Sequence, residues 1–214
     1  MARAWNPESP VMKALTRVFD LMLVNVLFIL TSLPVVTIGA SLTAMHYVLL
    51  HIARNEEGYI VRSYFRAFRM NFRQSTIVWI CMLLVGGVLV MDYRILDRLP
   101  EHSRQVASIL LIIVAIVYIC TLIYLYPFLA RFENTIFELF KNTLVVSLVF
   151  FIRTVAMIII LAGFAFFYYN LPLRATPILL LFGFSFPGII VAYIDTPILK
   201  RMEQMGEEED EGDD

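Results

Sequence analysis

The stretch that decides the fold is TSLPVVTIGAS at residues 31–41, halfway along an apolar run from Val18 to Ala53. It could kink one helix, join two helices or form a binding site. One helix over all 36 residues would be about 54 Å long and would need a tilt of about 56° to fit a hydrocarbon core of about 30 Å. Membrane helices tilt by about 20° on average, and Pro34 and Gly39 both favour a turn. The stretch is therefore predicted to be a tight hairpin between two spans.

The composition of the whole chain supports a membrane protein. Of its 214 residues 60% are hydrophobic and 16% are charged, whereas soluble domains have about 45–50% apolar and about 25% charged residues. The apolar residues fall in runs near 18–33, 36–53, 76–93, 106–129, 143–169 and 176–195. Because about 20 apolar residues cross a bilayer as a helix, we expect an all-α polytopic bundle with six transmembrane helices over residues 18–200.

The charge distribution orients these spans. With six spans, the inner segments carry twelve Lys and Arg residues and the outer loops carry four, whereas a single span over the first run would give nine inside against seven outside. The positive-inside rule therefore favours six spans with both termini in the cytoplasm. Residues 1–17 are expected to be a cytoplasmic amphipathic lead. The last eight residues, EEEDEGDD, hold seven acids, so residues 201–214 are expected to be a disordered cytoplasmic tail.

A basic amphipathic segment follows the second predicted span, in EEGYIVRSYFRAFRMNFRQS at residues 56–75. Two stripes recur at helical spacing: an apolar one at Val61, Phe65, Phe68 and Phe72, and a basic one at Arg62, Arg66, Arg69 and Arg73. This pattern is typical of an interfacial helix whose aromatic side chains enter the acyl boundary and whose guanidinium groups meet phosphates. It predicts either a lipid anchor or a docking surface for a cytoplasmic partner. Nucleic acid is not an expected partner.

The inner ends of the even-numbered spans resemble one another. Each carries Arg-x-Glu, beginning at Arg54, Arg131 and Arg201. We therefore predict three helical hairpins of similar plan, although bases at inner helix ends would also produce such short matches by chance.

Three charged residues inside the predicted spans form a hypothetical intramembrane polar cluster: Asp20, Arg153 and Asp195. A charge at the centre of a membrane helix costs about 2.5–3.5 kcal/mol, so such residues usually pair or line a cavity. The cluster is expected either to orient helices or to form a solute or ion site. Residues 182–188, FGFSFPG, would break or kink the sixth span, and broken spans sometimes mark transporter sites.

The sequence contains none of the patterns that would predict an enzyme. It has no phosphate loop, zincin helix, nucleophile elbow or paired-carboxylate loop, so no catalytic residue and no cofactor are expected. No metal site is expected either, because His46 and His51 stand five residues apart and so face different sides of a helix.

SLPVVTIGAS, followed by EEGYIVRSYFRAFRMNFRQSTIVW, resembles the YesL-like family of bacterial integral membrane proteins, a domain of unknown function. The resemblance covers most of residues 10–200. Members are often encoded near carbohydrate-uptake or sugar-degradation systems, which implies a location in the bacterial inner membrane and an accessory or regulatory role in carbohydrate uptake. The family provides no catalytic or binding residues to carry over, and the acidic tail departs from its pattern.

Two functions are therefore compared with the structure. The first is a non-enzymatic accessory membrane protein that uses residues 65–73 as its cytoplasmic contact face. The second is a small-solute transporter or channel that uses the broken helices and the polar cluster. In the hairpin, Thr31, Ser32, Thr37 and Ser41 are expected to cap helix ends rather than to bind a ligand.

Overall fold

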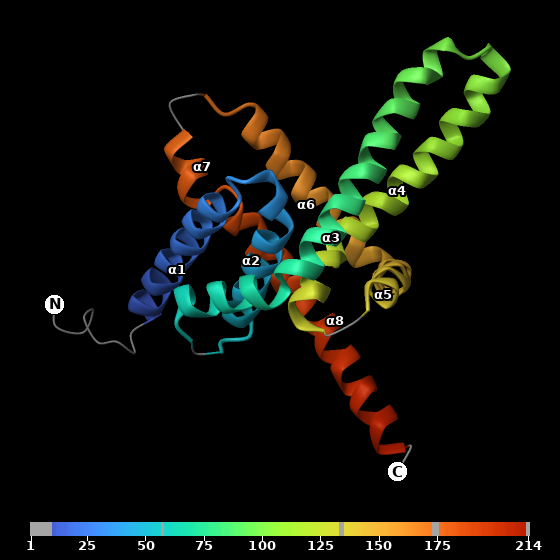
Figure 1. Cartoon of the computed structure of the whole chain (residues 1–214). Helices are drawn as coiled ribbons and strands as arrows, with labels where there is room; N and C mark the ends of the chain where they lie inside the picture. Colours follow the sequence, from blue (N-terminus) through green and yellow to red (C-terminus); the bar gives the residue numbers. More distant parts are fainter. Residues whose placement is uncertain (1–9, 57, 133–134, 173–175, 213–214) are drawn as a thin grey trace.

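A computed structural model describes residues 10–56, 58–132, 135–172 and 176–212. These residues form helices and no strands (Figure 1). The α-helices are α1 (Pro10–Thr31), α2 (Ile38–Ala53), α3 (Ile60–Ile95), α4 (Glu101–Arg131), α5 (Ile136–Val149), α6 (Phe151–Tyr169), α7 (Thr176–Phe182) and α8 (Ser185–Gly212). Six helical segments are long and apolar enough to cross a membrane: 11–31, 35–53, 60–98, 101–131, 151–169 and 176–204. The predicted all-α polytopic bundle is confirmed.

The predicted hairpin at residues 31–41 joins α1 to α2. α1 ends at Thr31, Pro34 is extended with φ −76° and ψ 119°, and a short 3-10 helix, Val35–Thr37, leads into α2. The indole N–H of Trp79 on α3 donates to the Val35 carbonyl at 2.9 Å and fixes the turn against the third span. The first apolar run is therefore two helices, as its length requires.

α2 is the central helix of the bundle because it contacts α1, α3, α4 and α8. Its buried residues include Ala44, Val48 and Leu49. Small side chains allow these close contacts: a Cβ atom on Gly39 would lie 2.5 Å from the Ser75 carbonyl oxygen and 2.6 Å from the Trp79 Cβ. α2 and α3 therefore pack backbone to backbone at this point, as small-residue spacing favours in membranes.

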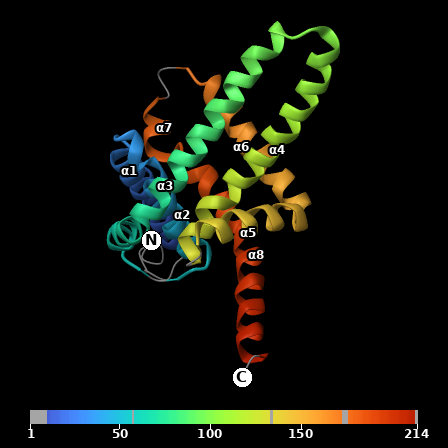
Figure 2. The same cartoon turned by 45° about the vertical axis from the view of Figure 1, so that its right-hand side comes forward.

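α3 and α4 form a long antiparallel hairpin that extends beyond the other helices (Figures 1 and 2). Their distal parts are apolar and exposed, with Leu84, Met91, Ile109 and Ile112 each more than half exposed. Such a surface fits lipid contact, since lipid tails are as apolar as these side chains. α3 is one continuous helix, but its first part lies at an angle to the part that pairs with α4 (Figures 1 and 2), so the amphipathic segment and the third span share one helix that bends between them.

The fifth predicted span, 143–169, requires a correction. Phe150 has φ −103° and ψ 38°, which ends α5 at Val149 and starts α6 at Phe151. Residues 143–149 therefore belong to α5, which packs against α4, and the span itself is Phe151–Tyr169. The apolar run is continuous across the break and contains no Pro or Gly there, so hydropathy alone did not separate the two helices.

The sixth span is broken, as residues 182–188 predict. α7 ends at Phe182, Gly183 and Phe184 form a turn, and α8 begins at Ser185. α8 then runs out of the bundle towards the C-terminus (Figure 2).

The expected disordered tail is helical as far as Gly212. A packed helix already exists before this point, and extending it avoids the cost of nucleation in a segment rich in helix-forming Glu. This corrects the expectation for residues 201–212. Residues 1–9 of the predicted lead and residues 213–214 of the tail lie outside the described residues, and α1 begins at Pro10.

Candidate functional site

The N-terminal half of α3 has three faces rather than the two that the sequence predicts. Tyr64, Ala67, Ser75 and Val78 are buried and form the face that packs on the bundle. The four arginines of the basic stripe are exposed, and helical spacing places them opposite that buried face: Arg62, Arg66, Arg69 and Arg73. No hydrogen bond or ion pair holds any of their guanidinium groups within the described part of the chain.

The aromatic residues of α3 lie between these two faces. Phe65 and Phe72 are 41% and 40% exposed, whereas Phe68 packs against the core. The predicted aromatic stripe is therefore only partly free. The missed residue is Tyr64, whose hydroxyl lies 2.7 Å from the Thr31 hydroxyl and donates to the Ser41 carbonyl at 3.3 Å. Tyr64 shares one helical face with the small residues Ala67 and Ser75. This spacing in the sequence could have indicated a third, buried face.

The hydroxyl groups of the hairpin bind backbone carbonyls rather than helix-capping N–H groups. Thr37 donates to the carbonyls of Thr31 and Pro34 at 2.6 and 2.7 Å, and Ser41 donates to the Thr37 carbonyl at 2.9 Å. Ser32 Oγ is buried and has no partner within the described ranges. Thr31 and Thr37 therefore satisfy carbonyls in the last turn of α1, whereas Ser41 bonds the Thr37 carbonyl one turn back. The expected capping of α2 is wrong, because no side chain of the described residues caps its first turn.

The helix break between α7 and α8 is held by one side chain from α1. The Asn25 amide donates to the carbonyls of Leu179 and Leu180 at 3.3 and 2.8 Å. Its carbonyl oxygen accepts from the backbone N–H groups of Phe184 and Ser185 at 2.8 and 2.9 Å. Broken backbone at membrane depth requires such partners because lipid provides none. Asn25 is therefore a structural residue of the break.

The hypothetical cluster of Asp20, Arg153 and Asp195 does not form a set of direct contacts: among the described residues, no hydrogen bond or ion pair joins the three. Asp20 lines a polar cavity at the ends of α1 and α2, while the Arg153 guanidinium lies 5.6 Å from the centre of the Phe150 ring. Asp195 is 1% exposed, and neither of its oxygens has a partner among the described residues.

Two ion pairs join the ends of three spans. Glu203 on α8 accepts from Arg54 at 3.0 and 3.3 Å and from Arg131 at 2.6 Å. The Arg54 side chain is only 5% exposed, so its charge depends on this partner. We name Arg54, Arg131 and Glu203 the three-helix clamp. One member of the clamp comes from each Arg-x-Glu motif, so the motif indicated these residues in the sequence. The sequence alone did not show that the three motifs meet.

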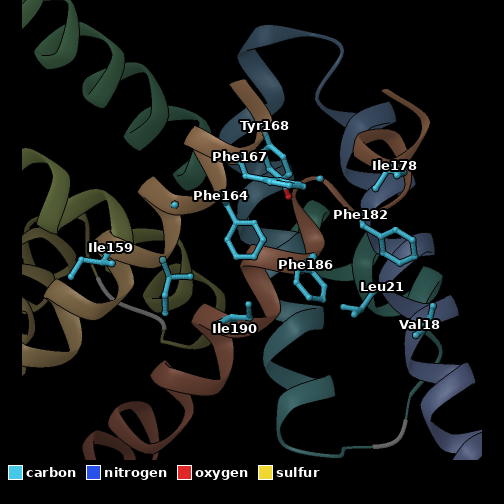
Figure 3. Close-up of a pocket in the computed structure, with 13 residues that line it drawn as sticks. Val18, Leu21, Ile159, Phe164, Phe167, Tyr168, Ile178, Phe182, Phe186 and Ile190 are labelled. Atoms are coloured by element: carbon cyan, nitrogen blue, oxygen red, sulfur yellow. The ribbon is translucent and has the colours of Figure 1, made fainter. Parts of the chain in front are cut away.

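Two large apolar cavities lie among the helices. The first, of about 870 Å³, lies between α1, α6, α7 and α8 and is lined by aromatic residues such as Phe164, Phe182 and Phe186 (Figure 3). The second, of about 600 Å³, lies between α2, α3, α4, α6 and α8 and includes His46, Trp79 and Tyr126 in its wall. We name the second the His46 cavity. Within the described ranges, no group of three His, Cys, Asp or Glu side chains could hold a metal ion.

Comparison with known families gives one result. Residues 21–93 match the family described as “Protein of unknown function, DUF624”. The matched segment holds both the hairpin and the basic stripe, so the predicted resemblance is confirmed there, and a YesL-like assignment is consistent with it. No curated protein and no solved structure matches the chain. The DUF624 match assigns no activity to these residues.

Proposed function

We propose that this integral membrane protein is a non-enzymatic accessory or regulatory subunit that binds a cytoplasmic partner through the basic stripe of α3. The observation that supports this proposal is the set of four exposed arginines without an internal partner, opposite the face that anchors α3. Four cationic side chains lie on one helix face and have no acidic partner among the described residues. Such a face favours binding to an anionic surface of another molecule. Exposed Phe65 and Phe72 beside them add apolar contact area.

The carbohydrate-uptake role rests on the YesL-like resemblance alone. It implies that the partner is a component of a sugar-transport complex in the bacterial inner membrane. The basic stripe would then face the cytoplasm, as the count of positive charges favours.

A double variant tests this function. Arg66→Gln with Arg69→Gln removes two charges from the stripe, while Arg98→Gln with Arg104→Gln removes two charges at the distal end of the α3–α4 hairpin as a matched control. A photo-crosslinking residue at Met70, which is 65% exposed, should capture a transport-complex subunit in cells, and only the first variant should lose it. Crosslinks to lipid alone in the unaltered protein would contradict a partner-binding role.

A solute transporter is the second candidate, and Asp195 is the observation that favours it. A buried carboxyl without a partner at membrane depth, on a helix that begins at a break, is a feature that proton-coupled transporters share. Solute flux in proteoliposomes of the isolated protein, abolished by Asp195→Asn, would support it. The apolar lining of both large cavities argues against a polar pathway through these cavities.

A further inference from the structure

The His46 cavity combines a nearly complete apolar lining with a polar side chain that has no partner. Its wall is formed by residues such as Leu42, Ile123, Leu161 and Val191. The His46 ring is part of this wall, and within the described part of the chain it forms no hydrogen bond. The hydroxyl of Tyr126, another lining residue, is also buried and has no partner in the part of the chain that the structure describes. Leaving such groups unpaired costs about 1–3 kcal/mol each, so a ligand that bonds them gains affinity.

The shape and position of the cavity indicate how a ligand would enter. Ala162 and Ala165 of α6 line it and are exposed, so the cavity is reachable from the lipid side. Its volume of about 600 Å³ lies within the range of small-molecule sites, about 300–1,000 Å³. The larger cavity in Figure 3 offers no comparable feature, since none of the residues that line it has a buried polar atom without a partner.

The chemistry of the lining limits the class of ligand. No Lys, Arg, Asp or Glu is among the described residues that line the His46 cavity. A phosphate or carboxylate headgroup would therefore lose its hydration without gaining a counter-charge. We propose that the His46 cavity binds a neutral amphiphile from the membrane, an acyl chain with an uncharged hydroxyl or ester headgroup that hydrogen-bonds to His46. This site is separate from the basic stripe, so its test is independent of the test of the proposed function.

Trp79 provides a direct reporter because it lines the cavity. In a Trp5→Phe background it is the only remaining tryptophan. The full chain is reconstituted in neutral phosphatidylcholine vesicles, and a monoglyceride with a brominated stearoyl chain is added as quencher. A phosphatidylglycerol with the same brominated chain is the comparison lipid. Saturable quenching at low mole fraction by the monoglyceride, and not by the phosphatidylglycerol, is expected.

Three variants locate the binding. His46→Phe removes the ring nitrogens at similar size and should raise the half-saturating mole fraction about fivefold, the effect of one neutral hydrogen bond. Ala165→Phe fills the cavity and should abolish saturation. Gly163→Phe adds the same side chain on α6 but towards the other cavity, where a Cβ meets no atom within 4 Å, and should change nothing.

Quenching that rises linearly with mole fraction, equally for both lipids and all variants, would mean contact with bulk lipid only and would overturn the proposal. The same holds if Gly163→Phe abolishes saturation while Ala165→Phe preserves it.

Discussion

At the scale of single residues, Gly39 sets the distance between α2 and α3. A Cβ there would meet backbone and Cβ atoms of α3 at 2.5 and 2.6 Å, which flexible side chains cannot relieve. Gly39→Ala should therefore lower the free energy of unfolding by about 1–3 kcal/mol. Gly87→Ala is the control, since a Cβ at Gly87 meets nothing within 4 Å and alanine favours the helix. Thermal denaturation in detergent measures both, and equal melting temperatures for the two variants would contradict the close packing.

Glu203 is the residue on which the three-helix clamp depends. Glu203→Ala leaves the buried Arg54 guanidinium without its carboxylate, and breaking a buried pair in this way costs about 3 kcal/mol. Lys200→Ala is the control because Lys200 is exposed on the same helix. A Glu203→Ala protein that melts at the same temperature as Lys200→Ala would show that the clamp adds nothing to stability.

At the scale of elements, the α7–α8 break depends on a side chain from another helix. Asn25→Leu removes the two hydrogen bonds that Asn25 donates and the two that it accepts. The free energy of unfolding should therefore fall by more than about 2 kcal/mol. Asn25→Asp should also destabilise the break, since a carboxylate cannot donate to the carbonyls of Leu179 and Leu180. Hydrogen exchange at Phe184 and Ser185 reports the opening directly. Unchanged exchange in both variants would refute this role of Asn25.

The start of α5 is predicted to respond to acid. Thr135 and Glu138 form a capping box, and the Thr135 backbone N–H and then its side chain lower the pKa of Glu138 below its ordinary value of 4.5. Because the folded-state pKa is depressed, the stabilisation is complete above the ordinary value and is lost as pH falls through the lowered pKa. Amide exchange of Glu138, corrected for its intrinsic rate, should accelerate over that window. The Glu138→Gln variant should lose the acid response, and a response of equal size in that variant would contradict the capping box.

How far the sequence predicts these elements depends on the range of the interaction. The hairpin at residues 31–41 was predictable, because helix length and Pro34 act locally and the charge count needs only the sequence. The break at Phe150 was not, since the residues around it are uniformly apolar and only packing distinguishes α5 from α6. The clamp and the Asn25 bonds join residues 72 to 160 positions apart along the chain, so periodicity could not reveal them.

At the scale of the whole molecule, the ends of the second, fourth and sixth spans meet at one side of the bundle through Arg54, Arg131 and Glu203. The start of α1 lies at the same side, because Arg17 bonds Asn55. Six spans with these ends together require the hairpin at residues 31–41 to lie at the opposite face. The predicted orientation in the membrane and the proposed cytoplasmic contact face both depend on this arrangement.

Single-cysteine labelling in intact cells tests that arrangement most directly. With Cys81 and Cys120 replaced by serine, one cysteine is placed at Val36 in the hairpin and, in a second protein, at Gly58 beyond α2; both positions are exposed. A membrane-impermeant maleimide should label Val36→Cys from outside, and Gly58→Cys only after the cells are permeabilised. Labelling of both positions from the same side would contradict the hairpin and with it the six-span bundle.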